Sequence, residues 1–235
     1  MSDRPLGPLV PEFSVPPVPS DIHLNGRSVQ VVKLGARHAE ALYEGYKGRD
    51  WVFDYMYETP FASLEDYEAW VARVAAKPDP YFVALCYPNG TAFGAASFMR
   101  ITPEHGVIEV GNINITPAAQ RSTAMTEAMF LMMQWAFDNG YRRYEWKCNA
   151  LNAPSRRAAQ RFGFSFEGVF RQHMIVKGRN RDTAWFAMTD QDWPALRQAY
   201  DAWLSPDNFG ADGLQRQSLR ALTAPHLAAT DPTIS

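Results

Sequence analysis

The amino-acid sequence predicts a mixed α/β domain whose sheet is largely antiparallel, with a βαβ unit at its centre. Two observations lead to this prediction. Two strand-like segments flank the turn sequence Pro88-Asn89-Gly90, an arrangement typical of a β-hairpin. Further along, a strand, a long apolar helix and another strand follow one another, which is the order of a βαβ crossover. A hydrophobic content of 46% in 235 residues is ample for the core of such a domain.

Strands and helices are expected to alternate along the domain, with one more helix at the end. Periodicity and turn residues predict strands at residues 28–34, 81–86, 91–101, 107–115, 142–148, 164–170, 173–176 and 183–188. The helices are expected at residues 36–45 and 63–76, ahead of Asn139-Gly140, at residues 152–162, and after Asp192-Trp193-Pro194.

Composition separates the two ends of the chain from this domain. Residues 1–26 hold six prolines and are predicted to form an extended arm. Residues 27–205 form the predicted domain. Residues 206–235 show little pattern, so we expect a loosely held C-terminal tail.

Charge and cysteine content exclude several classes of function. A net charge of −2 gives no general attraction to nucleic acid or to an anionic membrane surface. The sequence has no apolar run of about 18 residues and no basic-then-apolar start, so neither a membrane span nor a signal peptide is expected. Cys86 and Cys148 do not make a disulfide framework, which favours a reduced, cytoplasmic setting.

The long helix and the turn before it are the most informative part of the chain. Apolar residues recur at helical spacing and cover nearly all sides of the helix, so we expect it to be covered on two sides. The first turn of a helix has unpaired N–H groups and a positive dipole end, which together suit a phosphate group. An ordinary strand–helix turn is an equally weighted interpretation. The candidate phosphate-binding residues are Gln120, Arg121, Ser122, Thr123, Ala124, Met125 and Thr126.

The strand at residues 107–115 changes parity along its length. Ile108 and Val110 are even-numbered, whereas Ile113 and Ile115 are odd-numbered. Because side chains in a strand alternate with period two, one extra residue would explain the change. We therefore predict a β-bulge at Gly111-Asn112, which would free backbone groups for a ligand. The alternative is a strand that is buried on both faces.

With these motifs in order, the chain resembles the GCN5-related N-acetyltransferase (GNAT) family over roughly residues 27 to 200. The resemblance is carried by the bulged strand, the turn and helix that follow it, Asn152-Ala153-Pro154-Ser155 and Arg161-Phe162-Gly163-Phe164. Within the family it is most similar to the branch of ribosomal-protein N-terminal acetyltransferases. The later segments Arg179-Asn180-Arg181-Asp182-Thr183-Ala184-Trp185 and Asp192-Trp193-Pro194 also look like that branch.

The resemblance implies a GNAT-type fold that binds acetyl-CoA in a V-shaped cleft between two central strands. It implies that the backbone of Ile113, Asn114 and Ile115 pairs with the pantetheine arm. Asn152 and Ser155 match the Asn-x-x-Ser of the branch, which would place Asn152 on the pantetheine and Ser155 near the CoA sulfur. Asn152 is at the same time a predicted helix N-cap.

The sequence departs from the family pattern at three positions. The family's phosphate-binding turn is Gln/Arg-x-x-Gly-x-Gly/Ala. Gln120 matches it, but Thr123 and Met125 stand where small residues belong. Many members also carry a tyrosine four residues before the glycine of Gly-Phe, where this chain has Ala159.

Acetyl transfer to an amine needs a group that takes the amine proton, since a lysine-type amine has a pKa of about 10.4. We choose Glu109, just before the predicted bulge, as the general base; a salt-bridge role is the alternative. Glu145 is the other candidate carboxylate. Ser155 is the second catalytic candidate, as a hydroxyl that can protonate the leaving thiolate. Cys148 would suit a covalent acetyl-enzyme, but without a histidine near it in sequence a buried structural thiol is favoured.

The acceptor side is predicted to be aromatic, roofed by the loop of Trp51, Phe53, Tyr55 and Tyr57. Trp51, Tyr55 and Glu145 are the candidate acceptor-binding residues; the aromatic ones are equally compatible with a core role. His173 is a lone histidine, so no metal site is predicted.

The sequence therefore favours an acetyl-CoA-dependent N-acetyltransferase that transfers the acetyl group directly to a primary amine. The acceptor would be a protein N-terminus or a small amine. The main alternative is a non-catalytic acyl-CoA-binding sensor domain of the same fold, which the departures at Thr123 and Ala159 favour. A third alternative is a homo-oligomeric scaffold. A homodimer is compatible with each of these three hypotheses.

Overall fold

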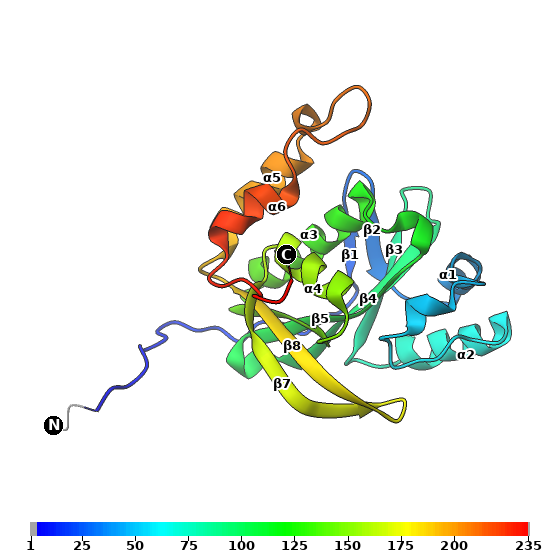
Figure 1. The fold of residues 1–235 in the computed structure, drawn as a ribbon, viewed down its shortest axis with the longest axis horizontal. Helices are drawn as coiled ribbons and strands as arrows, with labels where there is room; N and C mark the ends of the chain where they lie inside the picture. Colours follow the sequence, from blue (N-terminus) through cyan, green and yellow to red (C-terminus); the bar gives the residue numbers. More distant parts are fainter. Residues whose placement is uncertain (1–3, 235) are drawn as a thin grey trace.

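A computed structural model describes residues 4–234, and this part of the chain forms one eight-stranded sheet with helices packed against it (Figure 1). The strand order is β1-β2-β3-β4-β5-β6-β8-β7. Within the described residues, every neighbouring pair is antiparallel except β5 and β6, which are parallel. The strands are β1 (His23–Asn25), β2 (Gln30–Lys33), β3 (Tyr81–Cys86), β4 (Ala92–Thr102), β5 (Val107–Ile115), β6 (Arg143–Asn149), β7 (Ser165–Val176) and β8 (Arg179–Thr189).

The helices lie on both faces of the sheet. They are α1 (Ala39–Tyr46), α2 (Leu64–Ala75), α3 (Thr123–Asp138), α4 (Ala153–Arg161), α5 (Trp193–Leu204) and α6 (Leu219–Thr223). The mixed, largely antiparallel α/β fold predicted from the sequence is confirmed, including the βαβ unit β5–α3–β6.

Two hydrophobic cores sit on opposite faces of the sheet, and β3 shows how the sequence builds both. Its odd-numbered residues pack with α3 and α5, whereas its even-numbered residues pack with α1 and α2. All six residues of the strand are buried, which is why it reads as a continuous apolar run.

Helix α3 is covered on two sides, as its pattern predicted. One side faces the sheet, and the other packs against α5, where Phe130 stacks on Tyr200 and Phe137 stacks on Trp193. Ring centroids in these pairs are 5.1 and 4.9 Å apart, within the range of favourable aromatic contacts.

The predicted bulge in β5 is confirmed. Ser97 of β4 pairs with Gly111, but Ala95 pairs with Asn114, so two residues of β5 oppose one of β4. Asn112 has a φ of +50°, a left-handed conformation that asparagine tolerates better than most residues. The bulge restores the parity of the strand, so that Ile108, Val110 and Ile115 all reach the core on the α3 side.

Several boundaries differ from the sequence-based expectation. The short strand β1 was missed, because three residues give no periodicity to read. Residues 164–170 and 173–176, expected as two strands, form the single strand β7 with an irregularity between Phe170 and Met174. Gln172 has a positive φ of 50° there, and its N–H is held by the carboxylate of Asp182 at 2.7 Å.

The prediction of a loosely held C-terminal tail is wrong for residues 206–234. Leu219, Thr223 and Asp231 are buried, and Asp231 accepts a hydrogen bond from Arg156 Nε of α4 at 2.7 Å. The segment lacks periodicity because most of it is irregular backbone held by individual side chains rather than by a helix face.

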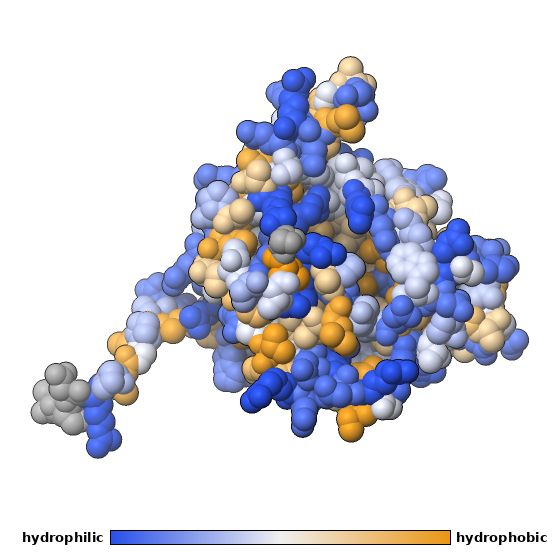
Figure 2. All heavy atoms as spheres, in the orientation of Figure 1, coloured by the Kyte–Doolittle hydropathy of each residue, from blue (hydrophilic) through white to orange (hydrophobic). Residues whose placement is uncertain are grey.

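The N-terminal arm behaves differently. From residue 4 it extends away from the body of the molecule, and Leu6 and Leu9 are exposed (Figure 1). Contact begins nearer the domain, where Tyr141 donates a hydrogen bond to the carbonyl of Pro17 at 3.0 Å. Hydrophilic residues cover much of the face of the body shown in Figure 2, with apolar residues in several groups among them. In the described part, no helix has the length and apolar character needed to cross a bilayer.

Candidate active site

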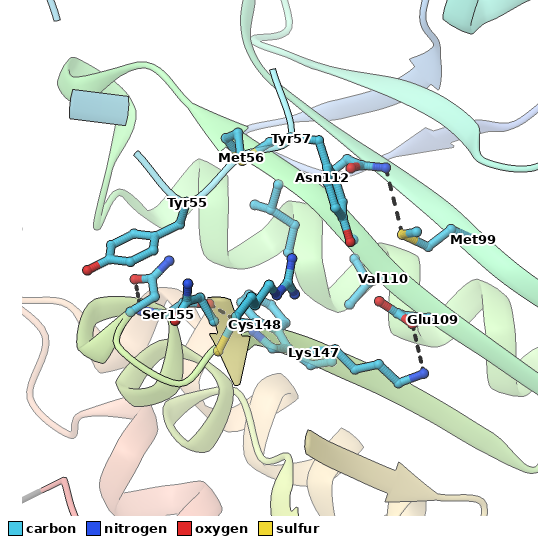
Figure 3. Close-up of a pocket in the computed structure, with 16 residues that line it drawn as sticks. Tyr55, Met56, Tyr57, Met99, Glu109, Val110, Asn112, Lys147, Cys148 and Ser155 are labelled. Carbon is cyan, nitrogen blue, oxygen red and sulfur yellow. Dashed lines mark hydrogen bonds and ion pairs between the residues drawn. The ribbon is translucent and has the colours of Figure 1, made fainter. Parts of the chain in front are cut away.

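A cleft opens where strands β5 and β6 stop pairing. The parallel register runs from Val107↔Arg143 to Val110↔Trp146 and then ends, although both strands continue. The space between them is about 590 Å³ when the open solvent at its mouth is included. Figure 3 shows Tyr55, Met56 and Tyr57 on one side of this cleft, across from Cys148 and Ser155.

The start of α4 forms the wall beside β6. Asn152 is the N-cap of α4, and its Oδ1 accepts a hydrogen bond from the N–H of Ser155 at 3.1 Å. Trp146 donates its indole N–H to Ser155 Oγ at 3.0 Å. The serine oxygen accepts this hydrogen bond and keeps its own proton, which a hydroxyl can rotate to donate. Trp146 was missed from the sequence, where it reads as one more apolar strand residue.

Glu109 reaches the cleft from β5 inside a network of charges. Its carboxylate pairs with Arg100 at 2.8 Å and with Lys147 at 3.0 Å, and its side chain is only 3% exposed. Arg100 is exposed and reaches Glu109 from a part of β4 with a register shift between Met99 and Thr102, where Asp79 accepts the N–H of Arg100 at 3.0 Å. The salt-bridge role considered as the alternative for Glu109 is therefore present, and its side chain also lines the cleft (Figure 3).

Glu145 does not line the cleft. It pairs with Lys147 at 2.6 Å and with Arg143 at 2.7 Å, and is itself buried. Burial alone would raise the pKa of Glu145, but the hydrogen bonds and charges of Lys147 and Arg143 outweigh it and lower that pKa. Glu145 is thus held as a carboxylate behind the cleft rather than within it. Lys147 completes this network with its ammonium group 3.8 Å from the ring centroid of Trp185.

The strand segment predicted to pair with pantetheine leads out of the cleft. Ile113 lines it, and Ile115 packs into the core. The carbonyl of Asn114 is already used, since Tyr46 donates its hydroxyl to that oxygen at 2.8 Å.

The predicted phosphate turn lies at the N-terminus of α3, outside the set of residues that line the cleft. Ser122 is the N-cap and accepts the N–H of Met125 at 3.1 Å. The first amides of the helix, at Thr123 and Ala124, have no acceptor within the helix. The one left-handed residue of the turn is Arg121, with a φ of +62°, whereas Thr123 is helical and exposed. Position 123 therefore needs no glycine for its conformation.

The other turn residues hold the helix start in place. Gln120 donates its side-chain N–H to the carbonyl of Ile115 at 3.2 Å. Thr126 is buried, donates its hydroxyl to the carbonyl of Ser122 and accepts a hydrogen bond from Arg161 of α4. The turn is thereby tied to both the strand and the helix that form the cleft.

The aromatic loop only partly meets its expected role. Tyr55 lines the cleft and donates its hydroxyl to the carbonyl of Leu151 at 3.2 Å, which ties the loop to the start of α4. Trp51 lies in a short 3₁₀ helix, is about half exposed and does not line the cleft. Met56 and Tyr57 do line it, although Met56 was not predicted.

Cys148 also faces the cleft but is poorly suited to act as a nucleophile. Burial raises the pKa of Cys148 to about 11 despite a hydrogen bond with Ser155, so the thiol stays protonated near neutral pH. Among residues 4–234 no group of three or more histidine, cysteine or acidic side chains is arranged to hold a metal ion.

Comparison with known proteins identifies this arrangement. A family model described as an acetyltransferase (GNAT) domain matches residues 29–165. A GCN5-related N-acetyltransferase from Brucella melitensis is 45% identical, with a TM-score of 0.88 over 92% of this chain and 100% of that one. The chain belongs to the GNAT acetyltransferase family.

Further GNAT structures agree with this membership. A probable GNAT acetyltransferase from Chromobacterium violaceum is 37% identical, with a TM-score of 0.78 over 83% of this chain and 99% of that one. The self-immunity acetyltransferase MccE of microcin C7, solved with acetyl-CoA and AMP, shares the fold at 20% identity, with a TM-score of 0.63 over 70% of this chain and 93% of that one. A comparison with curated proteins gives no match.

GNAT enzymes use acetyl-CoA as the acetyl donor, and the geometry of this chain fits such a donor. The cleft between β5 and β6 is open at the strand ends, and the unpaired helix start of α3 follows directly from β5.

Proposed function

We propose that this GNAT enzyme is an N-acetyltransferase that transfers an acetyl group directly to a primary amine, with both substrates bound at once. The proposal is supported chiefly by one observation. A carboxylate, Glu109, and a hydroxyl that can donate its proton, Ser155, reach the same cleft from its two sides. These are the groups needed to remove a proton from an amine and to protonate a thiolate.

On the donor side, the residues first indicated by the resemblance keep their proposed roles. Backbone groups of Ile113, Asn114 and Ile115 would hold the pantetheine arm, together with the side chain of Asn152. The turn from Gln120 to Thr126 would hold the pyrophosphate through the amides of Thr123 and Ala124. Arg121 is exposed at this turn and would add a charge-assisted contact.

On the acceptor side, Tyr55 and Tyr57 would cover the amine, and Trp51 would contact only a larger, peptide-like acceptor. A fold relative at 19% identity is a putative ribosomal-protein-serine acetyltransferase from Vibrio cholerae. It keeps a protein N-terminus among the candidate acceptors, beside small amines.

The proposed reaction needs only a few groups of the protein. Acetyl-CoA supplies an activated thioester, whose acetyl carbon gains a bond to the amine nitrogen as its bond to sulfur breaks. Glu109 accepts the proton that the amine nitrogen loses, directly or through a water, and later returns it to solvent. Ser155 donates a proton to the departing sulfur and takes up a replacement proton from solvent. Asn112 lies outside the regular pairing of β4 and β5, and a backbone N–H at this bulge would donate a hydrogen bond to the developing oxyanion.

Acetyl-CoA binding by calorimetry, followed in the same preparation by release of free thiol with a panel of amines, tests the proposal. We expect binding, thiol release with at least one amine, and initial-rate lines that intersect as in a ternary complex. Parallel lines would indicate a covalent acetyl-enzyme instead. Binding without thiol release for any amine would favour the non-catalytic sensor, and no binding at millimolar ligand would contradict the donor assignment.

A further inference from the structure

Arg181 of β8 is a buried cation that has no carboxylate partner among residues 4–234. It lines the cleft together with Cys148, Asn149 and Ser155, and only 7% of the residue is exposed. Its Nε atom is buried without a hydrogen-bond partner, and no ion pair to Arg181 occurs among residues 4–234. The guanidinium group of arginine keeps its charge in proteins, so the cost of burying it has to be offset by a partner.

The neighbouring carboxylates are already engaged elsewhere. Asp182 follows Arg181 in the strand, so its side chain points to the opposite face, where it binds Gln172 and Asn180. Glu109 is taken by Arg100 and Lys147. Each other cation of the network has at least one carboxylate partner, which leaves Arg181 as the uncompensated charge.

The protein offers Arg181 only partial compensation. The guanidinium lies 5.4 Å from the ring centroid of Tyr57, a cation–π contact. Such a contact stabilises a cation by less than a hydrogen-bonded anion does in a buried site. The surroundings are also electropositive: burial, and then the charges of Arg100, Arg181 and Lys147, lower the pKa of His173.

A buried, uncompensated charge is costly to fold, so its presence in a substrate cleft points to a charge that arrives with a substrate. The planar fork of arginine matches the two oxygens of a carboxylate or phosphate. We infer that the acceptor amine carries an anionic oxygen group, a carboxylate or a phosphate, and that Arg181 binds this group. This inference rests on the proposed acetyl transfer and narrows its acceptor class.

The test uses acceptors in matched pairs that differ only in the anion. Glycine, β-alanine and γ-aminobutyrate are compared with their amides, and phosphoethanolamine is compared with ethanolamine. The three amino acids differ in the distance from amine to carboxylate. The pair of phosphoethanolamine and ethanolamine shows whether a phosphate is preferred to a carboxylate. Thiol release gives kcat and KM for each acceptor and for acetyl-CoA, while calorimetry on the CoA-saturated protein gives binding without turnover.

We expect at least one anionic acceptor to exceed its neutral partner about 30-fold or more in kcat/KM, the effect of losing one partner of a buried charge pair. Arg181→Gln should reduce this ratio to about one, because the KM of the anionic acceptor rises. The KM of acetyl-CoA should stay unchanged. Arg181→Lys should keep part of the ratio. Arg179→Gln removes the same charge from an exposed position of the same strand and should leave the ratio intact.

Other outcomes distinguish a failure of the inference about Arg181 from a failure of the proposed acetyl transfer. If acids and amides react equally, if the preference survives in Arg181→Gln, or if only the acetyl-CoA KM rises, Arg181 does not bind an acceptor anion and the inference is wrong. If no amine releases thiol, the proposed transfer fails. Calorimetry still decides the inference in that case, because wild-type protein must bind an acid better than its amide and Arg181→Gln must not.

Discussion

The two walls of the cleft are built in different ways. The donor wall, at the start of α4, is neutral: Asn152, Ser155 and Trp146 are linked by hydrogen bonds of 3.0–3.1 Å. The acceptor wall is a network of charges around Glu109 and Lys147, both nearly inaccessible to solvent. The neutral wall suits a substrate held through backbone and amide groups, whereas the charged wall suits proton transfer and recognition of a charged acceptor. Variants of the two walls should therefore affect different kinetic constants.

The largest effect is expected on the acceptor wall. Glu109→Gln keeps the size of the side chain but removes the proton acceptor, and kcat should fall by about 10²–10⁴-fold, the usual contribution of a general base. The acetyl-CoA KM should change little. Initial rates of thiol release with a saturating amine measure both.

Glu145→Gln is the matched control for this variant. It also removes a carboxylate from Lys147, but from behind the cleft. We expect its kcat to stay within about tenfold of the wild type, since Lys147 keeps Glu109 as a partner. A loss in Glu145→Gln as large as that in Glu109→Gln would make Glu145 the base, or show that only the integrity of the network matters.

The donor wall depends on the C-terminal segment, because α4 is tied to it. Asp231→Ala would leave Arg156 buried without its partner and should lower the free energy of unfolding by about 3–5 kcal/mol. Urea denaturation measures this loss. Asp138→Ala, which breaks the exposed pair with Arg197, should cost at most about 1 kcal/mol.

The same variant also tests which of the two substrates helix α4 binds. In folded Asp231→Ala protein we expect the acetyl-CoA KM to rise while the acceptor KM holds, since Asn152 and Ser155 sit on the loosened helix. A rise confined to the acceptor KM would show that α4 serves the acceptor instead.

A smaller effect is expected from Ser155→Ala. A thiolate leaves readily, so loss of the proton donor should reduce kcat by about 10²-fold, the lower end for acid–base catalysis. Trp146→Phe removes the hydrogen bond to the serine but keeps its hydroxyl, and should cost less in kcat. Equal losses in the two variants would mean that Ser155 only positions the wall.

The donor wall was easier to predict from sequence than the acceptor wall, for a physical reason. Asn152 and Ser155 are three residues apart on one helix, and the bulge at Gly111-Asn112 leaves a parity change within one strand. Such features are local and can be read from spacing. The pairing of Glu109 with Arg100 and Lys147 joins three strands, and the direction of Arg100 depends on a second irregularity in β4 that left no parity signal we recognised.

The C-terminal segment shows the same limit. Nothing in the spacing of residues 206–234 indicates that Asp231 pairs with Arg156, 75 positions earlier in the chain. The partial role of the aromatic loop is similar, since Trp51 and Tyr55 are both aromatic residues of one short loop. Trp51 lies within the 3₁₀ helix Asp50–Phe53 and Tyr55 follows it, and only Tyr55 lines the cleft.

The smallest effect is expected at Cys148. Replacing this residue tests whether the acetyl group passes through a covalent acetyl-enzyme on its way from one wall to the other. Cys148→Ala should keep kcat within about threefold, because a thiol with a pKa of about 11 supplies almost no thiolate at pH 8. The raised pKa also predicts slow alkylation of the native protein at pH 8 and faster alkylation as the pH rises toward 11. Mass spectrometry after mixing with acetyl-CoA alone should show no acetylated cysteine. An acetylated Cys148, with loss of activity in Cys148→Ala, would contradict direct transfer and give Ser155 a role in activating the thiol instead.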